Sequence, residues 1–208
     1  MSTRSSRASE GGAFQMTREA IEDNAIAARW MAERGFPEPV VMGHSNGGML
    51  GVQHAVDHPA TRALVLLSAG RGGPTSVRSG GTEGLLAGAR FEEIHARASR
   101  LVAVGRGKDL ILLPGWWYVI TAESFIDRLT EVPDTIALAP QVRCPVLCVR
   151  GDKEDAYRYP AEEFQRLASS PSEAAVVRDC DHFYNGREEE VSSVVTSWLT
   201  RTLGLPPR

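Results

Sequence analysis

Cysteine, lysine and long apolar runs are all scarce in this chain of 208 residues. Three cysteines are too few for a disulfide-stapled fold. Lys and Arg together number 23 against 26 for Asp and Glu, so the net charge is -3 and no basic excess indicates a nucleic-acid partner. No apolar run approaches the roughly 20 residues that span a bilayer. We therefore expect a soluble, single-domain protein that binds neither nucleic acid nor membrane.

The positions of the cysteines indicate a reducing compartment. Cys144 and Cys148 lie four apart in a strand-like run. In a strand this spacing separates them by about 13 Å on one face, too far for a disulfide or a shared metal. Cys180 has no partner in the sequence, and the first ten residues lack the apolar core of a secretory signal. We expect buried thiols in a cytoplasmic protein.

Short apolar runs alternate with helical patterns along the chain, which predicts a mostly parallel α/β sheet of about four strands with flanking helices. Residues 1–16 form an irregular lead-in, and the glycine-rich stretch 70–88 predicts a loop. The most apolar segment, 110–118, is assigned no element. Strands are predicted at 40–42, 63–68, 145–150 and 174–178, and helices at 17–34, 46–58, 85–104, 121–131, 160–167 and 188–203.

The strongest local motif is Gly43-His44-Ser45-Asn46-Gly47, a G-x-S-x-G between a predicted strand and a predicted helix. Chance alone gives about 0.15 such matches in a chain of this composition. A nucleophilic serine on so sharp a turn needs glycine on either side, because side chains there would collide with the neighbouring elements. The strand–turn–helix context therefore favours Ser45 as a nucleophile over a turn without chemistry.

A nucleophilic serine needs a base, and the base needs an orienting acid. His182 follows the fourth predicted strand and is the candidate base, whereas His44 is interpreted as a packing residue of the turn. Three carboxylates follow the third predicted strand, namely Asp152, Glu154 and Asp155, and the residues alone leave the choice open.

A metal site is the alternative use of histidine in this chain. His54 and His58 are spaced i, i+4 on one predicted helix, which suits metal binding, but the sequence offers no Glu of an H-E-x-x-H motif and no evident third ligand. We expect no metal and no organic cofactor.

From about Thr17 to Leu203 the chain resembles the C-terminal two-thirds of an α/β-hydrolase. The residues that carry the resemblance are those of 40–48, 63–68, 144–154 and 181–183, with the serine, acid and histidine in the family's chain order. The resemblance implies Glu154 as the acid, with Asp155 as its rival. It also implies that residues 71–140 form a helical cap over the site. Trp116 and Trp117 would line a substrate pocket in that cap, and core packing is an equally good interpretation of them.

The resemblance departs from the family before Thr17, where members have four more strands and this chain has 16 residues. Those strands normally supply one of two oxyanion donors, and the other is the backbone N–H of Asn46. Losing one donor costs roughly 3–4 kcal/mol of transition-state stabilisation. The strand at Val40 would also be an exposed apolar edge. Three explanations stay open: a start codon assigned too late, a natural fragment, or a homodimer that covers the edge.

Two functions follow from these residues. The first is a serine hydrolase that cleaves a carboxylic ester, thioester or lactone, with Ser45, Glu154 and His182 as the triad and a small acyl compound as substrate. The alternative is a non-catalytic α/β-hydrolase-like scaffold that binds a ligand or a partner chain. The substrate itself is not readable from the sequence.

Overall fold

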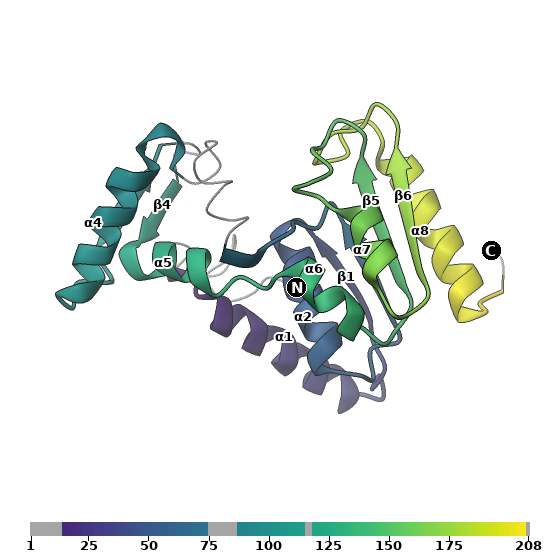
Figure 1. Cartoon of the computed structure of the whole chain (residues 1–208). Coiled ribbons are helices and arrows are strands. Elements are labelled where there is room, and N and C mark those ends of the chain that lie inside the picture. Colours follow the sequence, from purple (N-terminus) through teal and green to yellow (C-terminus); the bar gives the residue numbers. More distant parts are fainter. Residues whose placement is uncertain (1–13, 75–86, 115–117, 207–208) are drawn as a thin grey trace. The chain divides into compact units, whose positions relative to one another are not determined.

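The computed structural model describes residues 14–74, 87–114 and 118–206 (Figure 1). The chain divides into two compact units. One, called the sheet unit, comprises Ala28–Arg71 and Pro133–Arg208, and the other, called the hairpin unit, comprises Met1–Ala27 and Gly72–Val132. Helix α1 (Thr17–Ala32) belongs to both.

The sheet unit contains a parallel sheet, as the alternation of apolar runs and helices predicts. Within the described residues its strands are β1 (Val40–His44), β2 (Ala63–Leu67), β5 (Val146–Gly151) and β6 (Ser172–Val177), in the spatial order β1-β2-β5-β6. Val40 lies opposite Ala63, Leu64 opposite Val146, and Val146 opposite Ser172. The predicted fold class is confirmed for this unit.

Helices cover both faces of the sheet, which explains why its central strands are apolar throughout. On one face, Leu64 and Leu66 share a core with α2 (Asn46–Asp57) and α7 (Ala161–Leu167). On the other, Val65 packs in a core with Trp198 of α8 (Glu188–Leu203). Two short helical turns that the sequence analysis missed, α6 (Thr135–Leu138) and η3 (Ala139–Gln141), precede β5.

Strand β1 lies at one end of this order and, in the described part of the chain, pairs with β2 alone. Its Val40 and Met42 side chains are 38% and 52% exposed. A second copy of the chain that covers this edge stays a prediction.

The hairpin unit has a separate core and a second, two-stranded sheet. Strands β3 (Leu110–Leu113) and β4 (Tyr118–Thr121) are antiparallel, with Leu113 opposite Tyr118. Helices α4 (Phe91–Ala103), preceded by η2 (Gly88–Arg90), and α5 (Ala122–Thr130) belong to the same unit. Ile111, Ile120 and Phe125 are buried in its core. The expected cap region 71–140 is therefore not purely helical, and its role as a cap stays a prediction.

Most predicted boundaries agree with the structure to within two residues. The main exception is the helix expected over 85–104, which begins at Phe91 in the described residues. Helix α1 ends at Ala32, and Gly35, the predicted stop, follows it with a φ of 88°. No helix among the described residues combines the length and the apolar character that crossing a membrane requires.

Candidate active site

Ser45 occupies the turn between β1 and α2 with a φ of 55° and a ψ of -119°. Residues other than glycine rarely adopt a positive φ, and such strain persists only where the surrounding structure imposes it. Here the Ser45 N–H donates to the Leu67 carbonyl over 2.9 Å, and the Gly48 N–H donates back to the Ser45 carbonyl over 3.0 Å. The neighbouring strand and the first turn of the helix thus hold the serine at the carboxyl edge of the sheet.

The glycines around Ser45 do not all serve the purpose predicted for them. A Cβ atom at Gly43 would lie 2.2 Å from the Gly47 carbonyl oxygen, so glycine is required there. Outside its own helix and chain neighbours, a Cβ at Gly47 would meet no described atom within 4 Å, whereas one at Gly48 would lie 2.4 Å from the Cβ of Ala69. The prediction that Gly47 relieves a clash is therefore wrong, because the neighbouring strand end approaches the helix one residue later, at Gly48.

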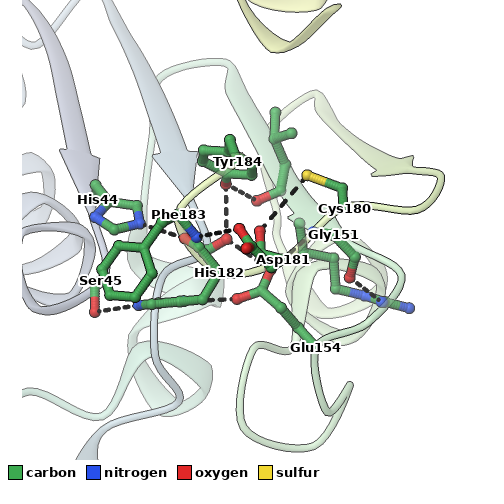
Figure 2. Close-up of polar contacts among 12 residues, drawn as sticks. His44, Ser45, Gly151, Glu154, Cys180, Asp181, His182, Phe183 and Tyr184 are labelled. Atoms are coloured by element: carbon green, nitrogen blue, oxygen red, sulfur yellow. Dashed lines mark hydrogen bonds and ion pairs between the residues drawn. The ribbon is translucent and has the colours of Figure 1, made fainter. Parts of the chain in front are cut away.

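Three of the predicted site residues meet at this edge of the sheet (Figure 2). His182 Nε2 lies 3.0 Å from Ser45 Oγ, and His182 Nδ1 lies 2.7 Å from Glu154 Oε1. An ionised carboxylate only accepts hydrogen bonds, so Nδ1 carries a proton and Nε2 of the neutral ring is free to accept one from the serine hydroxyl. The arrangement can draw a proton from Ser45 and stabilise the imidazolium that results.

The structure distinguishes among the carboxylates that follow the third predicted strand. Asp152 Oδ1 accepts from the Cys180 N–H over 3.1 Å, which ties its turn to the loop after β6. Asp155 Oδ1 accepts from the backbone N–H groups of Tyr157 and Arg158 over 2.8 and 2.9 Å. Both aspartates therefore accept hydrogen bonds from backbone N–H groups, and Glu154 is the carboxylate that contacts His182.

The loop that carries His182 passes close to the end of β5. A Cβ at Gly151 would lie 2.2 Å from the Cys180 carbonyl oxygen, so this approach requires glycine. Asp181 Oδ1 then accepts from the N–H groups of Phe183 and Asn185, which closes a turn around the histidine. Glu154 and His182 are 28 residues apart in sequence and meet because these two loops are joined.

His44 does more than the packing that the sequence analysis assigned to it. Its Nε2 lies 2.8 Å from the carbonyl oxygen of His182, and the two rings lie 4.8 Å apart between centroids. A carbonyl only accepts, so His44 Nε2–H donates and holds the histidine loop against the serine turn. The position of His44 between Gly43 and Ser45 was the available signal, since that turn must face the loop of the base.

The electrostatics of the site keep Glu154 ionised. Burial on its own would raise the pKa of this carboxyl, whose side chain is 2% exposed. Hydrogen bonds from His182, Ser68 and the Gly151 N–H, together with the charge of His182, outweigh burial and lower the pKa below its ordinary value. A charged carboxylate therefore faces the histidine at neutral pH.

Asn46 is the first residue of α2, directly after Ser45. A backbone N–H at this position has no acceptor within its own helix and lies at the positive end of the helix dipole. This N–H is suited to a developing negative charge on a substrate oxygen.

The structure describes only some of the other residues that the sequence singled out. Trp116 and Trp117 lie outside the described residues. All three cysteines are free and buried, and burial raises the pKa of each thiol. Across the described ranges, no three His, Cys, Asp or Glu side chains are grouped to hold a metal ion, and the rings of His54 and His58 stack on each other at 4.1 Å.

Solved structures share this fold over most of the chain. Est1E from Butyrivibrio proteoclasticus, in a structure with ferulic acid bound, is 17% identical with a TM-score of 0.69, over 98% of this chain and 76% of its own. The α/β-hydrolase GrgF from Penicillium sp. sh18 is 16% identical with a TM-score of 0.65, over 97% and 78%. The esterase domain of a Rhodothermus marinus protein is 20% identical with a TM-score of 0.58, over 87% and 68%.

Sequence comparison identifies the family more directly than these distant structures do. No curated protein matches the chain significantly. A model of the alpha/beta hydrolase family, in contrast, matches residues 5–194, which is most of the sequence. With the parallel sheet and the serine turn already described, this match shows that the chain belongs to the alpha/beta hydrolase family.

Proposed function

We propose that this protein is a serine hydrolase that cleaves a carboxylic ester, thioester or lactone. The observation that carries the proposal is the continuous hydrogen-bonded path from Ser45 Oγ through both ring nitrogens of His182 to Glu154. Nucleophile, base and orienting acid in this geometry are what acyl transfer through a covalent intermediate requires. The similarity in fold to a structure titled as an esterase domain supports the same class of chemistry.

In the first half of the proposed reaction, Ser45 Oγ attacks the acyl carbon while His182 Nε2 takes the hydroxyl proton. The carbonyl oxygen becomes an oxyanion, and the Asn46 N–H donates to it. His182 then gives the proton to the departing alkoxide or thiolate, which leaves an acyl group on Ser45. Glu154 stays ionised throughout and stabilises the imidazolium.

In the second half, a water molecule replaces the leaving group. His182 removes a proton from the water, the hydroxide attacks the acyl carbon, and the proton returns to Ser45 as the carboxylic acid departs. The same residues therefore serve both halves, and no step needs a cofactor.

Intact-mass analysis after exposure to a fluorophosphonate tests the proposal, with Ser45→Ala as the control. We expect one adduct per wild-type chain, no adduct on the variant, and hydrolysis of p-nitrophenyl acetate by the wild type only. Equal thermal unfolding of the two proteins would show that the fold is unaffected. A folded wild type without adduct or turnover would refute the hydrolase and favour the non-catalytic scaffold.

A further inference from the structure

Glu154 faces His182 with one oxygen, and its second oxygen is held by two other donors. Oε2 accepts from the Ser68 hydroxyl over 2.6 Å and from the Gly151 N–H over 2.8 Å. Ser68 Oγ in turn lies 2.7 Å from the hydroxyl of Tyr184, the second residue after His182. From these contacts we infer that Ser68 and Tyr184 form a two-hydroxyl relay that fixes the orientation of the Glu154 carboxylate, with Ser68 as a positioning residue for the proposed reaction.

The direction of the relay follows from the number of protons. Ser68 and Tyr184 have one hydroxyl proton each, and the carboxylate has none, so the Ser68 proton goes to Glu154. The Tyr184 hydroxyl then has two acceptors within reach, Ser68 Oγ at 2.7 Å and the Val149 carbonyl at 3.2 Å. The Val149 carbonyl already accepts from the Ser68 N–H over 2.7 Å. Because the Ser68 proton goes to Glu154, the 2.7 Å contact between the two hydroxyls needs the proton of Tyr184. Tyr184 therefore donates to Ser68, and each bond of the chain polarises the next.

The backbone at both relay residues is strained in the same way. Ser68 has a φ of 43° at the end of β2, and Tyr184 has a φ of 59° after β6. Neither is glycine, and both side chains are buried, with exposed fractions of 1% and 7%. Strain of this kind is retained where the surrounding structure imposes it, and it concentrates at functional sites. Two strained residues from different loops that converge on one carboxylate oxygen fit a positioning role.

Electrostatics support the same role. Burial raises the pKa of the Tyr184 phenol, so this hydroxyl stays protonated and remains a donor across the working pH range. The hydrogen bond from Ser68 lowers the pKa of Glu154 against the effect of burial. Removal of the Ser68 hydroxyl leaves a buried carboxylate with one donor fewer, so its pKa rises and it is freer to rotate away from His182.

The experiment compares Ser68→Ala, Ser68→Gly and Tyr184→Phe with the wild type, using p-nitrophenyl acetate across a range of pH. Alanine and glycine both remove the hydroxyl, and glycine also accepts a positive φ without strain. We expect both to lower kcat about 10- to 100-fold with little change in KM, and to move the acid limb of kcat/KM to higher pH. Recovery of wild-type kinetics in Ser68→Gly would overturn the proposal, since backbone strain alone would then explain Ser68→Ala.

Tyr184→Phe keeps the ring and removes the far end of the relay. We expect a smaller effect in the same direction, and no further loss when it is added to Ser68→Ala, because Tyr184 acts through Ser68. Fully additive losses would show that the two hydroxyls act independently and would overturn the relay.

The relay rests on the proposed function, so one readout must not depend on turnover. A ¹³C NMR titration of the Glu154 carboxyl carbon, assigned with Glu154→Gln, provides it. We expect the midpoint to rise in Ser68→Ala and Ser68→Gly, and an unmoved midpoint would overturn the proposal. If the wild type neither hydrolyses p-nitrophenyl acetate nor forms a fluorophosphonate adduct, the proposed function fails and this titration alone decides the relay.

Discussion

The sheet unit and the hairpin unit each bury a carboxylate, and the two carboxylates have different partners. Glu154 of the sheet unit faces a histidine ring, a serine hydroxyl and a backbone N–H. Asp127 of the hairpin unit is 6% exposed, and its Oδ2 accepts from the backbone N–H and the hydroxyl of Thr17 over 2.7 and 2.6 Å. Asp127 thus accepts hydrogen bonds from the first residue of α1. A negatively charged side chain is also favourable at the N-terminus of a helix.

The comparison teaches that burial of a carboxylate does not by itself indicate chemistry. Both carboxylates stay buried because donors satisfy them. What differs is whether a partner can exchange a proton, as an imidazole can and the backbone and hydroxyl groups of Thr17 cannot at neutral pH. We therefore expect substitutions at Glu154 to affect turnover and substitutions at Asp127 to affect stability.

The largest expected effect comes from Glu154→Gln. An amide keeps the size of the side chain but cannot stabilise the imidazolium and can impose the wrong tautomer on His182. We expect kcat/KM for p-nitrophenyl acetate to fall about 10³- to 10⁴-fold. The matched substitution, Asp127→Asn, is expected to leave kcat/KM within about twofold and to lower the free energy of unfolding by about 1 kcal/mol. Equal losses of kcat/KM in both variants would contradict the different roles assigned to the two carboxylates.

The glycines of the serine turn give the next largest effect. Gly48→Ala places a methyl group 2.4 Å from the Cβ of Ala69, so strand end and helix must move apart. We expect a loss of about 1–3 kcal/mol in the free energy of unfolding, measured with urea, and a lower rate of labelling at Ser45.

Gly47→Ala is the control within the same turn. Its added methyl group meets no described atom outside its own helix and chain neighbours, and alanine is a better helix former than glycine by about 1 kcal/mol. We expect this variant to be as stable as the wild type or slightly more stable. A Gly47→Ala variant less stable than Gly48→Ala would contradict the geometry of the turn.

Much of the sheet unit could be predicted from sequence because its signals are local. Short apolar runs mark the strands, and the polar residues that follow their carboxyl ends bring Ser45, Glu154 and His182 together at one edge. Ser68 ends a strand in the same way. Its role went unpredicted because a serine after a buried strand has no partner that is visible in sequence.

The hairpin unit was harder to predict because its strands carry apolar residues on both faces. Leu110 and Leu112 are 52% and 51% exposed, whereas Ile111 and Leu113 are buried at 1% each. The alternation that marks a half-buried strand is therefore hidden in a continuous apolar run. The residues alone left the choice among Asp152, Glu154 and Asp155 open for another reason: it depends on the direction in which a turn points three nearby side chains. The family resemblance favoured Glu154, which is the carboxylate that contacts His182.

A further expected effect appears only when the pH is lowered, and it again separates the units. His54 of the sheet unit is 5% exposed, and burial, aided by the charge of His58 and opposed by Asp57, lowers its pKa to about 4. Between about pH 6.5 and pH 4 the unfolded chain binds a proton at this histidine and the folded chain does not. The free energy of unfolding therefore decreases as the pH is lowered from about 6.5 to 4. From pH 7 to pH 5 the loss attributable to His54 is about 2 kcal/mol.

Urea unfolding of His54→Phe at the two pH values measures this contribution. Phenylalanine keeps a ring to stack on His58 and removes the titration, so the difference in unfolding free energy between pH 7 and pH 5 should shrink by about 2 kcal/mol relative to the wild type. His95, on α4 of the hairpin unit, stacks on Phe91 with centroids 5.9 Å apart, and His95→Phe is the matched control. We expect that control to keep the wild-type pH dependence. If His95→Phe flattened it as much as His54→Phe does, acid sensitivity would not be a property of the buried histidine in the sheet unit.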